Sequence, residues 1–149
     1  MTNGGIFVGP GEGRTIPGTD ALRLIATGEQ TGGSIGVLED TSSPGDGPPR
    51  HVHHSNDELF YVLEGEFLFL VGERQESVSV ETCVFVPRGT VHAYKVIGSE
   101  RGRLLSAVIP GGPERPSRSS SSCVPREKRW IGARAEAGPW HRGIGCSRR

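Results

Sequence analysis

The histidines of this chain are concentrated in one short segment, RHVHHSNDELFYVLEGE, at residues 50–66. His51, His53 and His54 lie close together, and two acidic residues follow them. Imidazole and carboxylate groups are ligands that Fe, Mn, Ni, Cu, Co and Zn accept in proteins. The segment is therefore a candidate metal site, although histidines that merely line a polar turn would give a similar local composition. Which side chains can share one ion depends on the path of the backbone.

Two prolines precede the histidines and prevent a helix from running through them, so we expect an extended path over residues 50–54. Side chains alternate between the two faces of a strand. His51 and His53 then point the same way, about 6.7 Å apart at the backbone, whereas His54 points to the opposite face. Only two of the three neighbouring histidines are thus expected to bind a common ion.

Glu58 stands at an even position, whereas His51 and His53 stand at odd positions. On one unbroken strand, Glu58 would therefore face the opposite side. A turn or bulge at 55–57 must therefore reset the alternation before Glu58 can face the same side. Asp57 would then point away from the site. We expect such a turn, with Glu58 as the third candidate ligand.

A fourth candidate comes from the segment VPRGTVHAYKV, at residues 86–96. Pro87 fixes the entry into a turn, and Gly89 can adopt the positive φ that returns the chain to a strand. His92 follows on that strand, with Tyr94 in phase with it.

These segments resemble the two sequence motifs of the cupins. The first motif, G(X)5HXH(X)3-4E(X)6G, is matched in full by Gly45, His51, His53, Glu58 and Gly65. Both motifs occur in the expected order, and the resemblance covers roughly residues 30–110.

The second motif, G(X)5PXG(X)2H(X)3N, is matched at Pro87, Gly89 and His92. Glu81 stands in place of its first glycine, and Val96 in place of its asparagine. We expect these two departures to affect turn and packing positions and to leave the ligands intact.

The resemblance implies an all-β fold, the double-stranded β-helix or jelly-roll barrel with antiparallel strands. It also implies one divalent transition metal per chain, bound by His51, His53, Glu58 and His92. Four protein ligands on a six-coordinate ion leave two positions, enough for a substrate oxygen and a small molecule such as O₂. The sequence does not distinguish among Fe, Mn, Ni, Cu, Co and Zn.

Within the cupins, the chain looks like small bacterial members similar to quercetin 2,3-dioxygenase. This likeness implies an oxidoreductase that acts on a small oxygenated compound, with Glu58 as a candidate base as well as a ligand. Two other classes of function stay open. One is a non-redox isomerase, cyclase or decarboxylase that uses the metal as a Lewis acid. The other is a non-catalytic, metal-dependent ligand-binding protein.

Aromatic and aliphatic side chains near the motifs are candidates for a substrate pocket, although such residues on strands more often belong to a packed core. They are Phe60, Val62, Phe67, Phe69 and Tyr94.

Short apolar runs separated by turns rich in Gly, Pro, Asp and Ser favour an antiparallel sandwich or barrel. The runs cover residues 6–8, 22–27, 34–40, 58–65, 66–72, 77–86, 90–98 and 103–110. Strands 58–64 and 66–71 are apolar at almost every position, and we expect both to be covered on both faces. We expect Cys83 to be a small buried side chain.

The charge changes abruptly near residue 112. Residues 1–112 carry 8 basic and 14 acidic residues, a net charge of −6, and residues 113–149 carry 9 and 3, a net charge of +6. The second part is rich in Ser and Arg and lacks apolar periodicity. We therefore expect a cupin domain at 1–112 and a disordered basic tail at 113–149, and we expect the metal site to be independent of the tail.

The sequence also leads to expectations about partners and compartment. The chain starts without a signal peptide and contains no stretch long enough to span a membrane, so a cytoplasmic location is expected. Its three scattered cysteines do not suggest a disulfide framework. We expect a small-molecule ligand or substrate and no membrane partner. Nucleic acid is not expected to bind the acidic domain, and a homodimer stays open.

Overall fold

The computed structural model describes residues 4–16, 22–111 and 121–123, and these residues form strands and turns without a helix. The strands are β1 (Arg14–Thr15), β2 (Leu22–Ala26), β3 (Gly36–Ser42), β4 (His51–His53), β5 (Asp57–Glu64), β6 (Phe67–Val71), β7 (Arg74–Val78), β8 (Cys83–Val86), β9 (His92–Val96), β10 (Gly102–Ile109) and β11 (Ser121–Cys123). No helix in this part of the chain could therefore cross a membrane.

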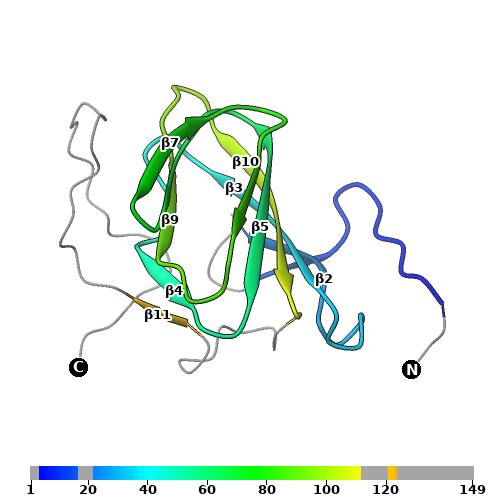
Figure 1. The fold of residues 1–149 in the computed structure, drawn as a ribbon. Coiled ribbons are helices and arrows are strands. Elements are labelled where there is room, and N and C mark those ends of the chain that lie inside the picture. Colours follow the sequence, from blue (N-terminus) through cyan, green and yellow to red (C-terminus); the bar gives the residue numbers. More distant parts are fainter. Residues whose placement is uncertain (1–3, 17–21, 112–120, 124–149) are drawn as a thin grey trace.

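The strands form two antiparallel sheets that pack against each other (Figure 1). The first sheet has the order β1-β2-β3-β10-β5-β8, and the second has the order β11-β4-β9-β6-β7. Strands distant in sequence are thus neighbours, since β10 lies between β3 and β5 and β9 lies between β4 and β6. This arrangement confirms the predicted all-β, antiparallel fold.

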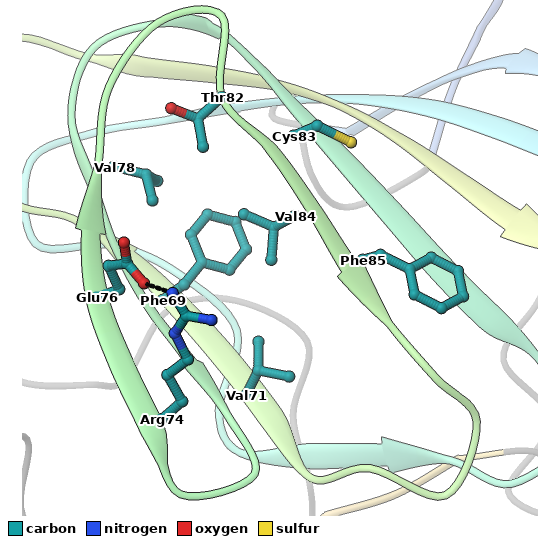
Figure 2. A pocket seen from close by; sticks show the side chains of 9 residues that line it. All are labelled: Phe69, Val71, Arg74, Glu76, Val78, Thr82, Cys83, Val84 and Phe85. Carbon is teal, nitrogen blue, oxygen red and sulfur yellow. Dashed lines mark ion pairs between the residues drawn. The ribbon is translucent and has the colours of Figure 1, made fainter.

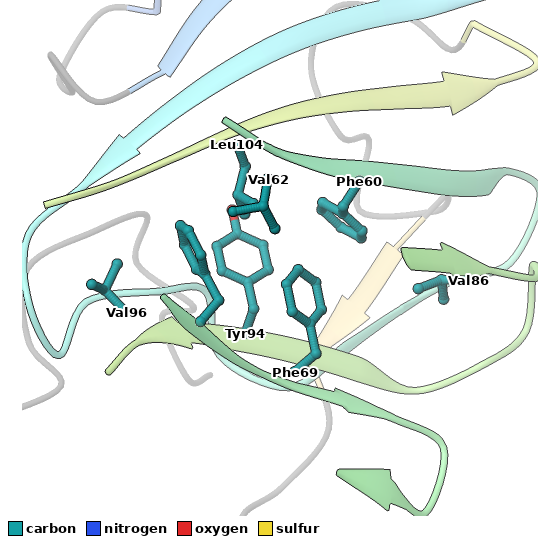
Figure 3. Close-up of a cluster of buried hydrophobic side chains, with 8 residues drawn as sticks. Phe60, Val62, Phe69, Val86, Tyr94, Val96 and Leu104 are labelled. Atoms are coloured by element: carbon teal, nitrogen blue, oxygen red, sulfur yellow. The ribbon is translucent and has the colours of Figure 1, made fainter. Parts of the chain in front are cut away.

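The core lies between the inner faces of the two sheets. Figure 3 shows Phe60 and Val62 of β5 facing Phe69 of β6 and Tyr94 of β9. The whole cluster consists of Phe60, Val62, Phe67, Phe69, Val86, Tyr94, Val96 and Leu104. The ring centroids of Phe60 lie 5.2 Å from Phe69 and 5.4 Å from Tyr94, which are distances typical of favourable aromatic packing.

The two most apolar strands differ in how they are covered. In β6, the four residues Phe67–Leu70 are all buried, as predicted for a strand covered on both faces. In β5, burial alternates, with Phe60 and Val62 buried and Tyr61 37% exposed. The prediction of two covered faces is therefore wrong for β5, because its outer face is only partly covered.

The predicted single strand at 77–86 is divided. β7 ends at Val78 and β8 begins at Cys83, and between them Glu81 has a φ of 69°. A positive φ interrupts an extended strand, so the chain turns here and starts the second strand on the opposite sheet. Within β8, Val84 and Val86 are more buried than their neighbours, and Cys83 is exposed. The prediction of a buried Cys83 is therefore wrong.

Both ends of the described chain differ in part from expectation. The apolar run at 6–8 forms no strand, and Phe7 is 97% exposed. Three residues of the expected tail, Ser121–Cys123, form β11 beside β4. The expected disorder therefore does not hold for these three. The rest of the tail, 113–120 and 124–149, lies outside the described residues.

Candidate metal centre

The four predicted ligands come from three strands and both sheets. His51 and His53 lie on β4, Glu58 is the second residue of β5, and His92 is the first residue of β9. One nitrogen or oxygen atom from each of the four lies within 4.8 Å of the others. The sequence-predicted set is thus brought together, without His54.

Local backbone structure explains why these side chains meet. Val52 is buried on one face of β4, while His51 and His53 lie on the other. A bend at residues 54–55 separates β4 from β5 and resets the alternation, slightly earlier in the chain than the turn expected at 55–57. Glu58 consequently shares the inner face of β5 with Phe60.

Asp57 faces away from the site, as its parity requires. Its carboxylate accepts hydrogen bonds from the backbone N–H of Arg88 at 2.8 Å and from the Arg88 guanidinium at 3.1 and 2.9 Å. These hydrogen bonds lower the pKa of Asp57 to about 2. The pair joins the start of β5 to the turn before β9, where Gly89 has the predicted positive φ of 79°. Two ligand-bearing strands are therefore linked next to the site.

Two of the histidines are oriented by backbone carbonyls. His51 Nδ1 lies 2.8 Å from the carbonyl oxygen of Pro49, and His92 Nδ1 lies 3.0 Å from that of Thr90. A carbonyl only accepts, so each Nδ1 carries the hydrogen. In the neutral ring, Nε2 then presents a lone pair, which is the arrangement of a metal-binding histidine.

Two histidine nitrogens lie close to the same carboxylate oxygen of Glu58, an arrangement that a positive charge between them would stabilise. His92 Nε2 lies 3.1 Å, and His53 Nε2 3.2 Å, from the same oxygen, Oε2 of Glu58. When the His92 ring is neutral, its Nε2 carries a lone pair and no hydrogen. Two hydrogen-bond acceptors, this nitrogen and the carboxylate oxygen, then face each other. Two acceptors this close need a proton or a metal ion between them. The donor set therefore fits a cation, and its mixture of imidazole and carboxylate suits a transition metal.

The protonation states also suit metal binding. Burial, with a smaller contribution from His92, lowers the pKa of His51 to about 4. Burial alone would raise the pKa of Glu58, but its hydrogen bonds with His53 and His92, which form when a proton lies between each pair of atoms, outweigh burial and lower that pKa to about 2. At neutral pH, His51 is therefore neutral and Glu58 ionised, which are the forms that bind metals.

The site reaches the surface on one side. His92 and Glu58 are buried, with 1% and 8% of their surface exposed, whereas His51 and His53 are partly exposed. A small molecule can therefore approach from the side of β4.

The candidate pocket residues form the core instead of an open cavity. Phe60, Val62, Phe67 and Tyr94 pack in the core cluster, which favours the core interpretation for these four. Phe69 belongs to the cluster and also lines a pocket.

That pocket, of about 250 Å³, lies between the β6–β7 hairpin and β8, along the open edges of the two sheets (Figure 2). None of the four candidate ligands lines it. Its lining residues are Phe69, Val71, Arg74, Glu76, Val78, Thr82, Cys83, Val84 and Phe85.

Sequence reasoning missed a buried polar group inside the barrel. The hydroxyl of Tyr94 donates to Oδ2 of Asp40, and the hydroxyl of Ser42 donates to Oδ1 of Asp40 at 2.8 Å. Asp40 lies on the same face of β3 as Leu38, which points inward. An acidic residue at such a position was the feature of the sequence that could have revealed this buried polar group. Tyr94, which supplies one of the two hydroxyls, lies two residues after His92 on β9.

Comparison with known proteins now places this geometry in a family. Residues 40–108 match the family described as "Cupin domain". Residues 40–108 form a cupin domain. The two motifs that carry the ligands both lie inside this matched segment.

A relative by sequence is quercetin 2,3-dioxygenase of Bacillus subtilis (strain 168), which is 28% identical over 102 residues. The match covers 68% of this chain but only 30% of that enzyme. The chain thus spans less than a third of the relative that it matches.

Several solved structures share the fold at low sequence identity. KdgF from Halomonas sp. is 16% identical, with a TM-score of 0.62 over 72% of this chain and 94% of that one. A protein with a double-stranded β-helix domain from Klebsiella pneumoniae is 21% identical, with a TM-score of 0.56 over 67% and 84% of the two chains. A protein of Thermotoga maritima, described as a predicted oxalate decarboxylase, is 19% identical, with a TM-score of 0.58 over 60% and 78%. These likenesses concern the fold alone.

Proposed function

We propose that this cupin binds one divalent transition metal through His51, His53, Glu58 and His92 and oxidises a small oxygenated compound with O₂. The observation that carries the proposal is the convergence of the four side chains within 4.8 Å, with Nε2 of His92 3.1 Å from a carboxylate oxygen of Glu58. The similarity to quercetin 2,3-dioxygenase supports oxygenase chemistry over other uses of such a site.

A redox metal bound here would supply Lewis acidity toward a substrate oxygen and a means of activating O₂. The protein's own groups would hold and shield the reactants. The buried side chain of Phe60, whose ring centroid lies 6.2 Å from that of His92, closes the inner side of the site with apolar surface. Substrate would therefore lie on the exposed side, against His51 and His53.

Glu58 is better suited to bind metal than to act as a base. Its pKa of about 2 makes it a weak proton acceptor at neutral pH, because the two histidines already stabilise the anion. We therefore assign Glu58 the role of an anionic ligand.

Metal analysis of protein purified without a chelating tag tests the ligands. We expect about one metal ion per chain. We also expect His51→Ala, His53→Ala and His92→Ala each to lower metal affinity by at least about 100-fold, since loss of groups that merely orient ligands costs 10–100-fold. His54→Ala is the matched control and should retain the metal, because His54 is exposed and outside the group. Retention in His51→Ala with loss in His54→Ala would refute the assignment.

Oxygen consumption tests the reaction. With Fe²⁺, Mn²⁺ or Co²⁺ bound, the protein should consume O₂ when quercetin is added, and His92→Ala should not. Metal binding without O₂ consumption on a panel of oxygenated aromatic compounds would contradict the oxygenase proposal. Turnover under nitrogen would then point to non-redox metal chemistry, and its absence to a ligand-binding cupin.

A further inference from the structure

The strand that carries His51 and His53 is short and weakly paired on its inner side. β4 has three residues, and its pairing with β9 consists of the single position His51↔His92. One further backbone hydrogen bond, from Gly89 N–H to the carbonyl oxygen of His53 at 2.7 Å, ties it to the neighbouring turn. A strand held this way, with its other edge open, would fray easily.

The other edge of β4 is not open. β11 pairs antiparallel with every residue of β4, at Ser121↔His53, Ser122↔Val52 and Cys123↔His51 (Figure 1). β4 is therefore an interior strand of its sheet, and most of its pairing comes from a segment that follows the cupin domain in the chain.

We infer that β11 positions the metal ligands His51 and His53. The inference rests on the proposed metal binding at these residues. Metal ligands have to be held within about 0.5 Å of their productive positions, and the backbone that carries them has to be fixed accordingly. Without β11, the N–H and C=O groups along one edge of β4 would face water, and local opening of the strand would become easy. The expectation that the metal site is independent of residues 113–149 is thereby replaced.

A double proline variant of the full-length chain tests the inference. In an antiparallel ladder, adjacent residues alternate in whether they bond to the neighbouring strand. Ser121→Pro combined with Ser122→Pro therefore removes at least one bond to β4, whichever residue makes it. Ser117→Pro, which lies in the same serine-rich segment but outside β11, is the matched control.

The first measurement is the affinity for Co²⁺, from competition with a chelator of known affinity. We expect the double variant to bind Co²⁺ about 10–100-fold more weakly than the unchanged protein, the range seen when groups that orient ligands are lost. Ser117→Pro should bind as the unchanged protein does. Equal affinity for all three proteins would overturn the inference.

The second measurement needs no metal. In the presence of excess chelator, amide exchange at Val52 and His53 should be faster in the double variant than in the control, while β6 stays protected to the same extent. Unchanged exchange in β4 would overturn the inference, and faster exchange throughout β6 would show a general loss of fold instead. If the unchanged protein bound no metal, the proposed function would fail, but this measurement would still show whether β11 holds β4.

Discussion

At the scale of single residues, the hydrogen bond between Tyr94 and Asp40 links the two sheets through an apolar interior. Tyr94 belongs to β9 in one sheet and Asp40 to β3 in the other. Burial raises the pKa of Asp40, and the hydrogen bonds from Tyr94 and Ser42 act against this rise. Burial, together with the nearby Asp40, also raises the pKa of Tyr94, which keeps its hydroxyl protonated as a donor. The hydrogen bond from Tyr94 thus offsets part of the cost of burying the Asp40 carboxylate.

Tyr94→Phe should therefore destabilise the protein at neutral pH. It leaves one oxygen of a largely buried carboxylate without its donor, and such a loss costs about 1–3 kcal/mol. Urea unfolding measures the change in the free energy of unfolding. Tyr61→Phe is the control, because Tyr61 lies on the partly covered outer face of β5, and it should change that free energy by less than about 0.5 kcal/mol. Equal effects of the two substitutions would contradict the role given to the Asp40 hydrogen bond.

The effect of Tyr94→Phe should also depend on pH. The folded-state pKa of Asp40 lies above the ordinary value of an aspartate, so ionised Asp40 opposes folding and protonated Asp40 does not. Removing the Tyr94 hydroxyl raises that pKa further, because its hydrogen bond lowers it. The difference between the two proteins should consequently be largest at neutral pH and shrink as the pH falls through the folded-state pKa of Asp40. A difference that grows on acidification would show the opposite linkage.

At the scale of elements, the turn between β7 and β8 contains a strained residue. Glu81 has a φ of 69°, and it is the only non-glycine residue with a positive φ in the part of the chain that the structure describes. The cupin motif has glycine at this position. A residue with a Cβ adopts this conformation at a cost of about 1–2 kcal/mol, whereas glycine adopts it freely.

Glu81→Gly should therefore stabilise the protein, by about 1 kcal/mol after allowance for the greater freedom of glycine in the unfolded chain. Thermal or urea unfolding gives the change. Ser79→Gly is the matched control in the same turn, at a position without a positive φ, and should not stabilise. Stabilisation by both substitutions, or by neither, would argue against strain at Glu81.

Most strands could be predicted from apolar runs. The runs could not show which strand faces are buried, or where one run divides into two strands. β5 and β6 both contain apolar runs, yet Leu68 of β6 is buried and Tyr61 of β5 is partly exposed. An apolar run alone does not show whether other segments cover the outer face of its strand. The break at Glu81 escaped prediction because no glycine or proline marks it. Strand alternation could predict that His51 and His53 share a face, and the resemblance to the cupin motifs implied Glu58 and His92 as their partners.

At the scale of the whole molecule, the metal centre joins the two sheets. Glu58 comes from the sheet that contains β5, and the three histidines come from the sheet that contains β4 and β9. A bound ion would tie both sheets together at one end of the barrel, and an unfolded chain would not present these four groups together. Metal binding should therefore be coupled to the stability of the entire domain.

Chelation should lower the melting temperature of the unchanged protein. Binding to the folded state alone adds about 2.7 kcal/mol when free metal exceeds its Kd a hundredfold. Differential scanning calorimetry with and without chelator measures the shift, and the His92→Ala variant should show little or none. A chelator-dependent shift of the same size in His92→Ala would locate the stabilising ion elsewhere.

The order of strands within the sheets has a consequence for synthesis of the chain. β9 and β10 lie in the interior of their sheets, yet they are the last barrel strands to be made. A nascent chain that has reached only β8 can form local pairs such as β6 with β7, but it cannot join β3 to β5 or β4 to β6. Until then β5 and β6 can each pair on one side only, with β8 and β7, and their other edges stay open, a state that favours aggregation. The two sheets can therefore be completed only after β10 has left the ribosome.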